Sequence, residues 1–499
     1  MVDAPAPDAA PEPAQALTPA NQNPWYVLAT LHGEQPEGAT HGAFDKEIHA
    51  KNRLTWNKWA AGALSQKQRD ILRERHEDSG QPVFSEQELT PYTAKEMVAL
   101  KRRWRRQWTD RNPSQPVVPL PDPSQFVDYS SVHFDRPIIW EGIFSTRIIH
   151  FTGAKFSRDA ILSNSLFFEF ADFRGVEFYG YTSFCDIKFC RNAWFEKRNF
   201  FKHAHFTDSI FQSVWFESTI FHRSVDFRRS SFSDIACYTD VTFLNYAQFS
   251  EVDFFGDVWF SRSTFSNDAW FASATFTGEA WFGNAKLQSS TSFADARFIL
   301  NPPLFHGATL HEGTQWHGAR WPVPPDDAAQ AQEHIYAYER LKQEMERLKK
   351  HDDELQFFER EMRCRRVVEG WSTPAGLLNR AYDLFSGYGR SIFRPMLGLL
   401  ATFVLGIAAM VQAACWPGRA GSCPAILTLD SPFIAFKQAT LLSFANMLAP
   451  LNVRKDFFDA DMLAGLSGWL KIVGGLQTLL ALAFAFLIGL ALRNRFRLR

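Results

Sequence analysis

The feature that most constrains this chain is a single apolar residue, nearly always phenylalanine, that returns every five or six residues, with one step of seven, between Phe168 and Trp321. An amphipathic helix needs apolar residues about every 3.6 positions and a half-buried strand needs them every second position, so neither element explains the spacing. A fixed longer period indicates stacked coils, each of which buries its apolar side only against its neighbours. The series is therefore predicted to be the core. Its regularly spaced members include Phe173, Phe184, Phe195, Phe206, Phe216, Phe227, Phe249, Phe260, Phe271, Phe282 and Phe293.

A second column fixes the orientation of the first. A small or β-branched residue stands two positions before most of these aromatic residues, as Ala171 does before Phe173. In an extended segment, positions i−2 and i face one side and i−1 faces the other. From Phe221 onward, steps of five and six residues alternate, which gives 22 residues for four sides. The additional residue is expected at a corner, because a slip on the strand would turn the phenylalanine outward.

The fragments Ala171-Asp172-Phe173, Val225-Asp226-Phe227 and Val252-Asp253-Phe254 resemble the repeat of the pentapeptide-repeat proteins. The resemblance implies an all-β, right-handed, four-sided β-helix, expected over residues 128–322 with eight to nine coils and a length of about 40 Å. A weaker series extends this solenoid backwards and consists of Phe134, Ile139, Phe144, Ile149, Phe151, Phe156 and Ile161.

The chain before the solenoid divides into a tail and a small domain. Residues 1–23 are rich in Pro and Ala, which predicts disorder, and they do not have the pattern of a cleaved secretory signal. Residues 24–127 are expected to form a small α/β or α-rich domain, with "NPWYVLATLHGEQ" as a short strand and loop and "HAKNRLTWNKWAAGAL" as a helix. This region resembles the leader of bacterial pentapeptide-repeat membrane proteins, which implies no activity.

A basic and aromatic cluster, Lys101 to Trp108, is expected to end a helix. Its five cations and two tryptophans could bind anionic lipid headgroups or nucleic acid, or the cations could be solvated while the tryptophans pack on the domain. The net charge of −1 gives no general attraction to nucleic acid, so no nucleic-acid partner is expected.

The C-terminal part is predicted to be helical and membrane-bound. Residues 326–370 read as an amphipathic helical hairpin linker that caps the open coil or pairs between subunits. In a membrane domain at 394–499, residues 396–416 and 472–492 are each long and apolar enough to span a bilayer. Arginines flank the outer ends of both spans, which predicts a multi-pass protein of the bacterial inner (cytoplasmic) membrane with both termini and the solenoid in the cytoplasm.

The loop between the spans contains a further apolar segment, 431–451, that carries Lys437, Gln438, Ser443 and Asn446. It is too polar for a third span and is expected to be a re-entrant or interfacial helix. Span, short helix and span resembles the layout of two-span ion channels, with Ser443 and Asn446 as candidate pore-lining residues, although the filter of potassium channels is missing. Cys415 and Cys423 would lie outside the cell, where a disulfide is chemically permitted.

Several outward tryptophans are candidates for a partner surface. A 22-residue coil places Trp215, Trp259 and Trp281 on one side and Trp270 on the opposite one. Alternatively, each tryptophan only covers the corner bulge beside it.

No catalytic constellation, metal-ligand set or phosphate loop is apparent, so neither enzymatic activity nor a cofactor is expected. The leading hypothesis is a bilayer-anchored scaffold that binds an unknown protein partner. The alternative is a homo-oligomeric ion channel gated by the solenoid.

Overall fold

The computed structural model describes residues 16–75, 82–197, 199–370, 372–413, 432–451, 453–459, 463 and 466–497. The chain divides into two compact units, of which the first ends at Val323 and the second begins at Pro324. Residues 1–15 of the expected tail lie outside the described residues, as do Cys415 and Cys423.

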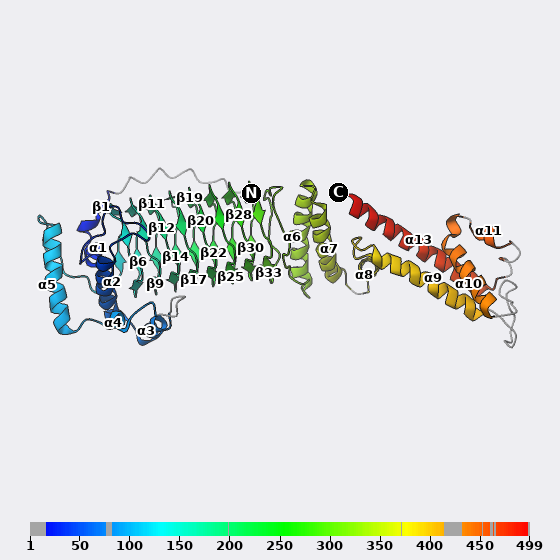
Figure 1. The fold of residues 1–499 in the computed structure, drawn as a ribbon, viewed down its shortest axis with the longest axis horizontal. Coiled ribbons are helices and arrows are strands. Elements are labelled where there is room, and N and C mark those ends of the chain that lie inside the picture. The colour runs from blue at the N-terminus through cyan, green and yellow to red at the C-terminus, as the bar shows by residue number, and fades with distance from the viewer. Residues whose placement is uncertain are drawn as a thin grey trace, which may run out of the picture. The chain divides into compact units, whose positions relative to one another are not determined.

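The first unit contains a four-sided β-solenoid of about eight turns, whose short strands form four parallel sheets (Figure 1). We number the sides in the order in which the chain visits them. Side 1 contains β2 (Val127–Asp128), β6 (Ile149–His150), β10 (Ala171–Asp172), β14 (Ala193–Trp194), β18 (Val214–Trp215), β22 (Ala236–Cys237), β26 (Val258–Trp259) and β30 (Ala280–Trp281). Side 2 contains β1 (Thr18–Pro19), β3 (Val132–Phe134), β7 (Lys155–Phe156), β11 (Glu177–Phe178), β15 (Asn199–Phe200), β19 (Ile220–Phe221), β23 (Thr242–Phe243), β27 (Thr264–Phe265) and β31 (Lys286–Leu287).

The other two sides complete the square. Side 3 contains β4 (Ile138–Ile139), β8 (Ala160–Ile161), β12 (Thr182–Ser183), β16 (Ala204–His205), β20 (Val225–Asp226), β24 (Ala247–Gln248), β28 (Ala269–Trp270) and β32 (Thr291–Ser292). Side 4 contains β5 (Phe144–Ser145), β9 (Leu166–Phe167), β13 (Lys188–Phe189), β17 (Ile210–Phe211), β21 (Ser231–Phe232), β25 (Asp253–Phe254), β29 (Thr275–Phe276) and β33 (Arg297–Phe298).

The interior consists of aromatic columns that run along the solenoid. Phe249, for example, is fully buried and stacks in parallel on Phe227 and Phe271 of the neighbouring coils, with 5.0 Å between ring centroids in both pairs. The columns of sides 1 and 3 meet edge to face, as Phe249 does with Phe260 at 5.4 Å and 84°. Both geometries are favoured by the quadrupole of the ring. All eleven phenylalanines that the sequence places in the core are fully buried.

The alternation of five and six residues reflects two kinds of corner. The five-residue corners, between sides 1 and 2 and between sides 3 and 4, contain a residue with positive φ, such as Asp240 (57°) or Ser273 (58°). At these corners the amide three residues after the aromatic residue donates to the carbonyl oxygen of that residue and closes a tight turn. Ala274 N, for example, donates to Phe271 O at 3.1 Å. The six-residue corners contain no positive-φ residue among those described, and the additional residue lies there.

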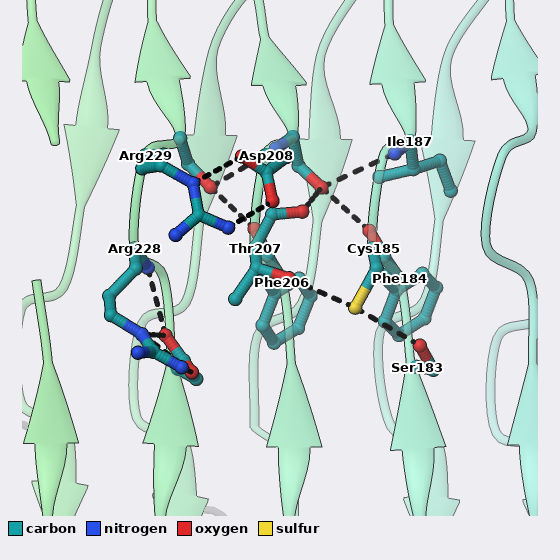
Figure 2. A network of polar contacts seen from close by, with 12 residues as sticks. Ser183, Phe184, Cys185, Ile187, Phe206, Thr207, Asp208, Arg228 and Arg229 are labelled. Atoms are coloured by element: carbon teal, nitrogen blue, oxygen red, sulfur yellow. Dashed lines mark hydrogen bonds and ion pairs between the residues drawn. The ribbon is translucent and has the colours of Figure 1, made fainter. Parts of the chain in front are cut away.

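Figure 2 shows the corner between sides 3 and 4, where neighbouring coils are also joined by side chains. Arg229 donates to both carboxylate oxygens of Asp208, at 2.7 Å each, from one coil to the next. The buried hydroxyl of Ser209 donates to Phe184 O at 2.6 Å, so the small inward position satisfies a backbone carbonyl in the core.

The earliest part of the predicted ladder is shifted by one residue. The inward position of side 4 is Phe167, which stacks on Phe189, and not Phe168. On side 3 the register places Trp140 and Leu162 in the column, and Ile139 and Ile161 therefore face outward. On side 4, Phe144 also precedes the column position, and on side 1 Ile149 occupies the small inward position.

The shift has a physical cause, because helices cover the outward face of the first coils and make it apolar as well. These helices are α1 (Pro24–Ala29), α2 (Lys46–Ala60), α3 (Gln66–Arg73), α4 (Glu86–Leu89) and α5 (Ala94–Arg111), with 3₁₀ turns η1 (Ala20–Gln22) and η2 (Ala61–Ala63). Trp56 of α2 donates to Phe144 O at 3.0 Å, and Phe84 packs edge-on against the Phe144 ring at 5.6 Å. The alternation of apolar residues alone cannot distinguish a residue that lines the core from an outward residue that a helix covers.

Two further expectations at the N-terminus are wrong. Residues 18–22 are ordered rather than part of a disordered tail, because Thr18 pairs with Val132 and adds β1 to the sheet edge. The segment predicted as a short strand is instead α1, since the Asn23 side chain accepts from the amides of Trp25 and Tyr26 and Pro24 suits a first helical position.

The second unit is helical. α6 (Ala328–Arg347) and α7 (His351–Glu369) form a helical hairpin, and Tyr338, Leu341 and Phe357 are buried in it. Its remaining elements are α8 (Pro374–Ser386), α9 (Phe393–Ala413), α10 (Pro432–Met447), η4 (Ala449–Leu451), α11 (Arg454–Phe457) and α13 (Gly468–Arg497).

Candidate functional site

The outward face of side 1 carries a column of aromatic residues, because the second residue of each strand points away from the core. Trp194, Trp215, Cys237, Trp259 and Trp281 occupy equivalent positions on five successive strands. The rings of Trp194 and Trp215 stack with 6.1 Å between centroids. Trp281 is 40% exposed, and the other three tryptophans are half-buried. We call these five residues the side-1 column.

The structure brings together the tryptophans that the sequence analysis placed on one side. Trp215, Trp259 and Trp281 lie on side 1, whereas Trp270 is on β28 of side 3. Trp270 packs against Tyr246 at 5.3 Å and is half-buried. Trp194 was not among the residues selected as a partner surface, although the register of 21 residues between it and Trp215 would have added it to the same column.

Carboxylates line both edges of the side-1 column. Among the described residues none of these carboxylates forms an ion pair; they are Glu196, Glu217, Asp234, Asp257 and Glu279. Trp281 Nε1 donates to Glu279 Oε2 at 2.8 Å, which fixes the ring against the edge. Burial is the main cause that raises the pKa of the Cys237 thiol; hydrogen bonds with Thr239 oppose it, and the nearby Glu217 and Glu196 add a smaller increase. The thiol is therefore protonated at neutral pH, and the face combines aromatic area with negative charge.

The basic cluster on α5 has its aromatic residues turned inward. Trp104 and Trp108 are buried and donate to Val118 O and Pro116 O, both at 3.0 Å. The cations Lys101, Arg102, Arg103, Arg105 and Arg106 are exposed. The tryptophans thus hold the proline-rich linker to the helix and are not available to enter a bilayer interface.

Two helices of the second unit are long and apolar enough to cross a membrane, over Phe393–Gln412 and Gly468–Phe496. Large apolar side chains cover their outer surfaces, and Phe393, Leu405 and Phe486 are 76%, 69% and 70% exposed. Such a surface is unfavourable in water and suits a lipid environment. α10 packs against both helices and forms a small buried cluster with them through Ala439, Leu442 and Ala445.

Ser443 and Asn446, the candidate pore-lining residues, are buried between α10 and the two long helices. Gln477 of α13 donates to Ser443 Oγ at 2.5 Å and accepts from Asn446 Nδ2 at 3.2 Å. Arg454 Nε donates to Asn446 Oδ1 at 2.7 Å. Gln477 was not singled out from the sequence, although its place in the middle of an apolar helix was the signal that it has a polar partner.

Close helix packing makes room for this polar cluster. A Cβ on Gly406 of α9 would lie 2.3 Å from Gln477 Nε2, and one on Gly474 would lie 2.8 Å from Arg454 Nη2. The absence of side chains at both glycines therefore lets the polar groups reach one another. The side chains of Ser443, Asn446, Arg454 and Gln477 are thus hydrogen-bonded to one another within one chain.

No group of three potential metal-ligating side chains occurs among the residues that the structure describes. Residues 238–286 match the family described as pentapeptide repeats (9 copies). Searches among curated protein sequences and among solved structures give no match to the chain.

The architecture is that of a four-sided parallel β-solenoid followed by helices. Together with the family match, this identifies the solenoid as a pentapeptide-repeat structure, and two candidate membrane helices lie at the C-terminal end of the chain. Solenoids of this kind are commonly scaffolds for protein interaction and are more typically structural than catalytic.

Proposed function

We propose that the chain is a scaffold of the bacterial inner membrane that binds a protein partner through the side-1 column. The observation that carries the proposal is the alignment of four outward tryptophans on one rigid sheet, with unpaired carboxylates along both edges. Tryptophan is enriched at the centres of protein interfaces, and a solenoid holds its side chains in fixed register, so little entropy is lost on binding.

Anchoring follows from the two long apolar helices of the second unit. Arg390 and Arg394 precede the first of them, and Arg493 and Arg495 lie at the end of the second. Because short arginine-rich flanks stay in the cytoplasm, the proposal has both termini and the solenoid on the cytoplasmic side. Labelling of single cysteines introduced near residues 16 and 495 in intact cells tests this, since a membrane-impermeant reagent should modify neither.

The docking surface is tested by site-specific photo-crosslinking in cells, with the photoreactive amino acid at position 259 or at position 270. Both positions are half-buried tryptophans at the second position of a two-residue strand, but they lie on opposite sides of the solenoid, so position 270 is the matched control. We expect a protein adduct of one defined mass from position 259 only. Trp281→Ala should reduce that adduct. Equal labelling from both positions would contradict a docking function of side 1.

A further inference from the structure

A pocket of about 410 Å³ lies between α2 and α5 of the first unit, away from the side-1 column. Lys51 and Lys58, seven residues apart on α2, face Glu96 and Arg103, seven residues apart on α5. Residues at this spacing lie on one face of a helix, so the two helix faces form the opposite walls. The volume is within the usual range for a small-molecule site.

The lining of the pocket has an excess of positive charge. Lys58 Nζ lies 2.9 Å from Glu96 Oε1, so these two charges compensate each other. Lys51 is paired only with Glu47, which is exposed and does not line the pocket. Arg103 has no carboxylate partner among the described residues. The lining therefore holds three cations and one carboxylate, an excess of two positive charges, and the exposed Glu47 offsets Lys51 only from outside the pocket.

Arg103 is held in place by a neutral acceptor. Its Nη1 lies 2.7 Å from Nδ1 of His32, and the His32 ring also contacts Thr55 Oγ1 at 2.9 Å. Burial, and then Arg103 and Lys51, lower the pKa of His32 to about 4, so the imidazole is uncharged at neutral pH and does not neutralise the guanidinium. A guanidinium has five N–H donors, which leaves donors of Arg103 for a further ligand.

The remaining walls suit an apolar or planar body. Tyr92 lines the pocket, and Lys58 Nζ lies 5.0 Å from the centre of its ring, while Leu54 and Leu100 add apolar surface. We propose that this pocket binds a phosphate monoester, with Arg103 and Lys51 on the phosphate and the rest of the molecule against Tyr92. A dianionic phosphate matches the excess of two positive charges in the lining, whereas a carboxylate would match only one of them.

The phosphate monoester could be a soluble metabolite or the headgroup of phosphatidic acid, since both carry the same terminal group. The full chain in detergent micelles is titrated by calorimetry with inorganic phosphate, AMP and glucose 6-phosphate. Phosphatidic acid in phosphatidylcholine bilayers is presented in a separate arm, with pure phosphatidylcholine as its reference. Saturable binding of a soluble probe identifies a soluble ligand, and binding to phosphatidic acid alone identifies the lipid source.

Arg103→Gln should weaken the binding of the responsive probe at least tenfold, and Lys51→Gln should weaken it severalfold. Arg105→Gln is the matched control, because Arg105 is an exposed arginine on the same helix that does not line the pocket, and it should change binding less than twofold. The proposal is overturned if none of the four probes binds at millimolar concentration. It is overturned equally if Arg103→Gln and Arg105→Gln weaken binding to the same extent, which would indicate diffuse attraction to a basic helix.

Discussion

Replacing one core phenylalanine should open the solenoid locally by a predictable amount. Phe249 is fully buried, stacks on two rings at 5.0 Å, and meets Tyr238 and Phe260 edge to face at 5.4 Å each. Truncation of a buried phenylalanine to alanine costs about 3–5 kcal/mol, and aromatic pairs add about 0.5–1.5 kcal/mol each. Because these four pairs and a fifth, edge-to-face with Phe243 at 5.9 Å, are lost at once, Phe249→Ala should lie at the upper end, at about 4–5 kcal/mol.

The effect should be confined to the neighbouring coils, because each coil of a solenoid contacts only the adjacent ones. Amide hydrogen exchange of the full chain in micelles measures this coil by coil. A loss of about 4 kcal/mol corresponds to roughly a thousandfold faster exchange in the strands around residues 227–271. Exchange in α2 should be unchanged.

Phe255→Ala is the matched control. It removes the same side chain six residues further along, from a corner where the ring is 55% exposed. We expect a cost below about 1 kcal/mol, since little apolar area returns to water. If the two substitutions accelerate exchange equally, or if Phe249→Ala accelerates it less than tenfold, the stacked column is not what holds the coils together.

Three further predictions concern a corner, a histidine and the membrane helices. Ser273 is exposed but has φ of 58°, so Ser273→Val should destabilise its turn by about 1–2 kcal/mol, whereas Ser273→Asn should be nearly neutral. Hydrogen exchange in residues 271–276 measures the difference, and equal exchange in the two variants would refute the strain argument. The pKa of His32 is lowered to about 4 in the folded chain, so the stability that the neutral ring contributes is complete above pH 6.5 and is lost as the pH falls from 6.5 towards 4. Discounted for the partial exposure of the ring, this loss amounts to about 1–2 kcal/mol. Unfolding measured over a pH series should show a shallower fall of stability with pH in His32→Gln than in the wild type. Gln477→Leu should weaken the packing of α10 by about 1–2 kcal/mol, measured as faster proteolysis of residues 432–447. Liposomes that contain the wild-type chain or Asn446→Leu should stay impermeable to ions. An ion flux that Asn446→Leu alters would favour the channel alternative.

Periodicity was sufficient to predict the solenoid, its core and the sides on which its tryptophans lie, because those properties depend only on spacing along the chain. It failed at Phe168, Ile139 and Ile161, where both faces of the strand are buried and alternation no longer marks the inside. It also could not predict the pocket between α2 and α5. His32 and Arg103 are 71 residues apart, and only the packing of the two helices brings them together.

The polar cluster of the second unit shows a different limit. Ser443 and Asn446 were recognised as unusual in an apolar segment, but a sequence does not say whether such groups face water or one another. Gly406 and Gly474, which give Gln477 and Arg454 the space to reach them, are noticeable only once α9, α10 and α13 are placed together.

The two kinds of corner also determine where this solenoid can change its length. Among the described residues of the solenoid, two coils depart from 22 residues by a change within a corner, one shortened between Phe211 and Phe216 and one lengthened between Phe298 and Phe305. Both changes occur at the six-residue corner between sides 4 and 1, where no hydrogen-bonded left-handed turn fixes the number of residues. That edge is a seam along which insertions and deletions are accommodated without disturbing the stacked rings, and it is where a foreign loop could be grafted onto the tube.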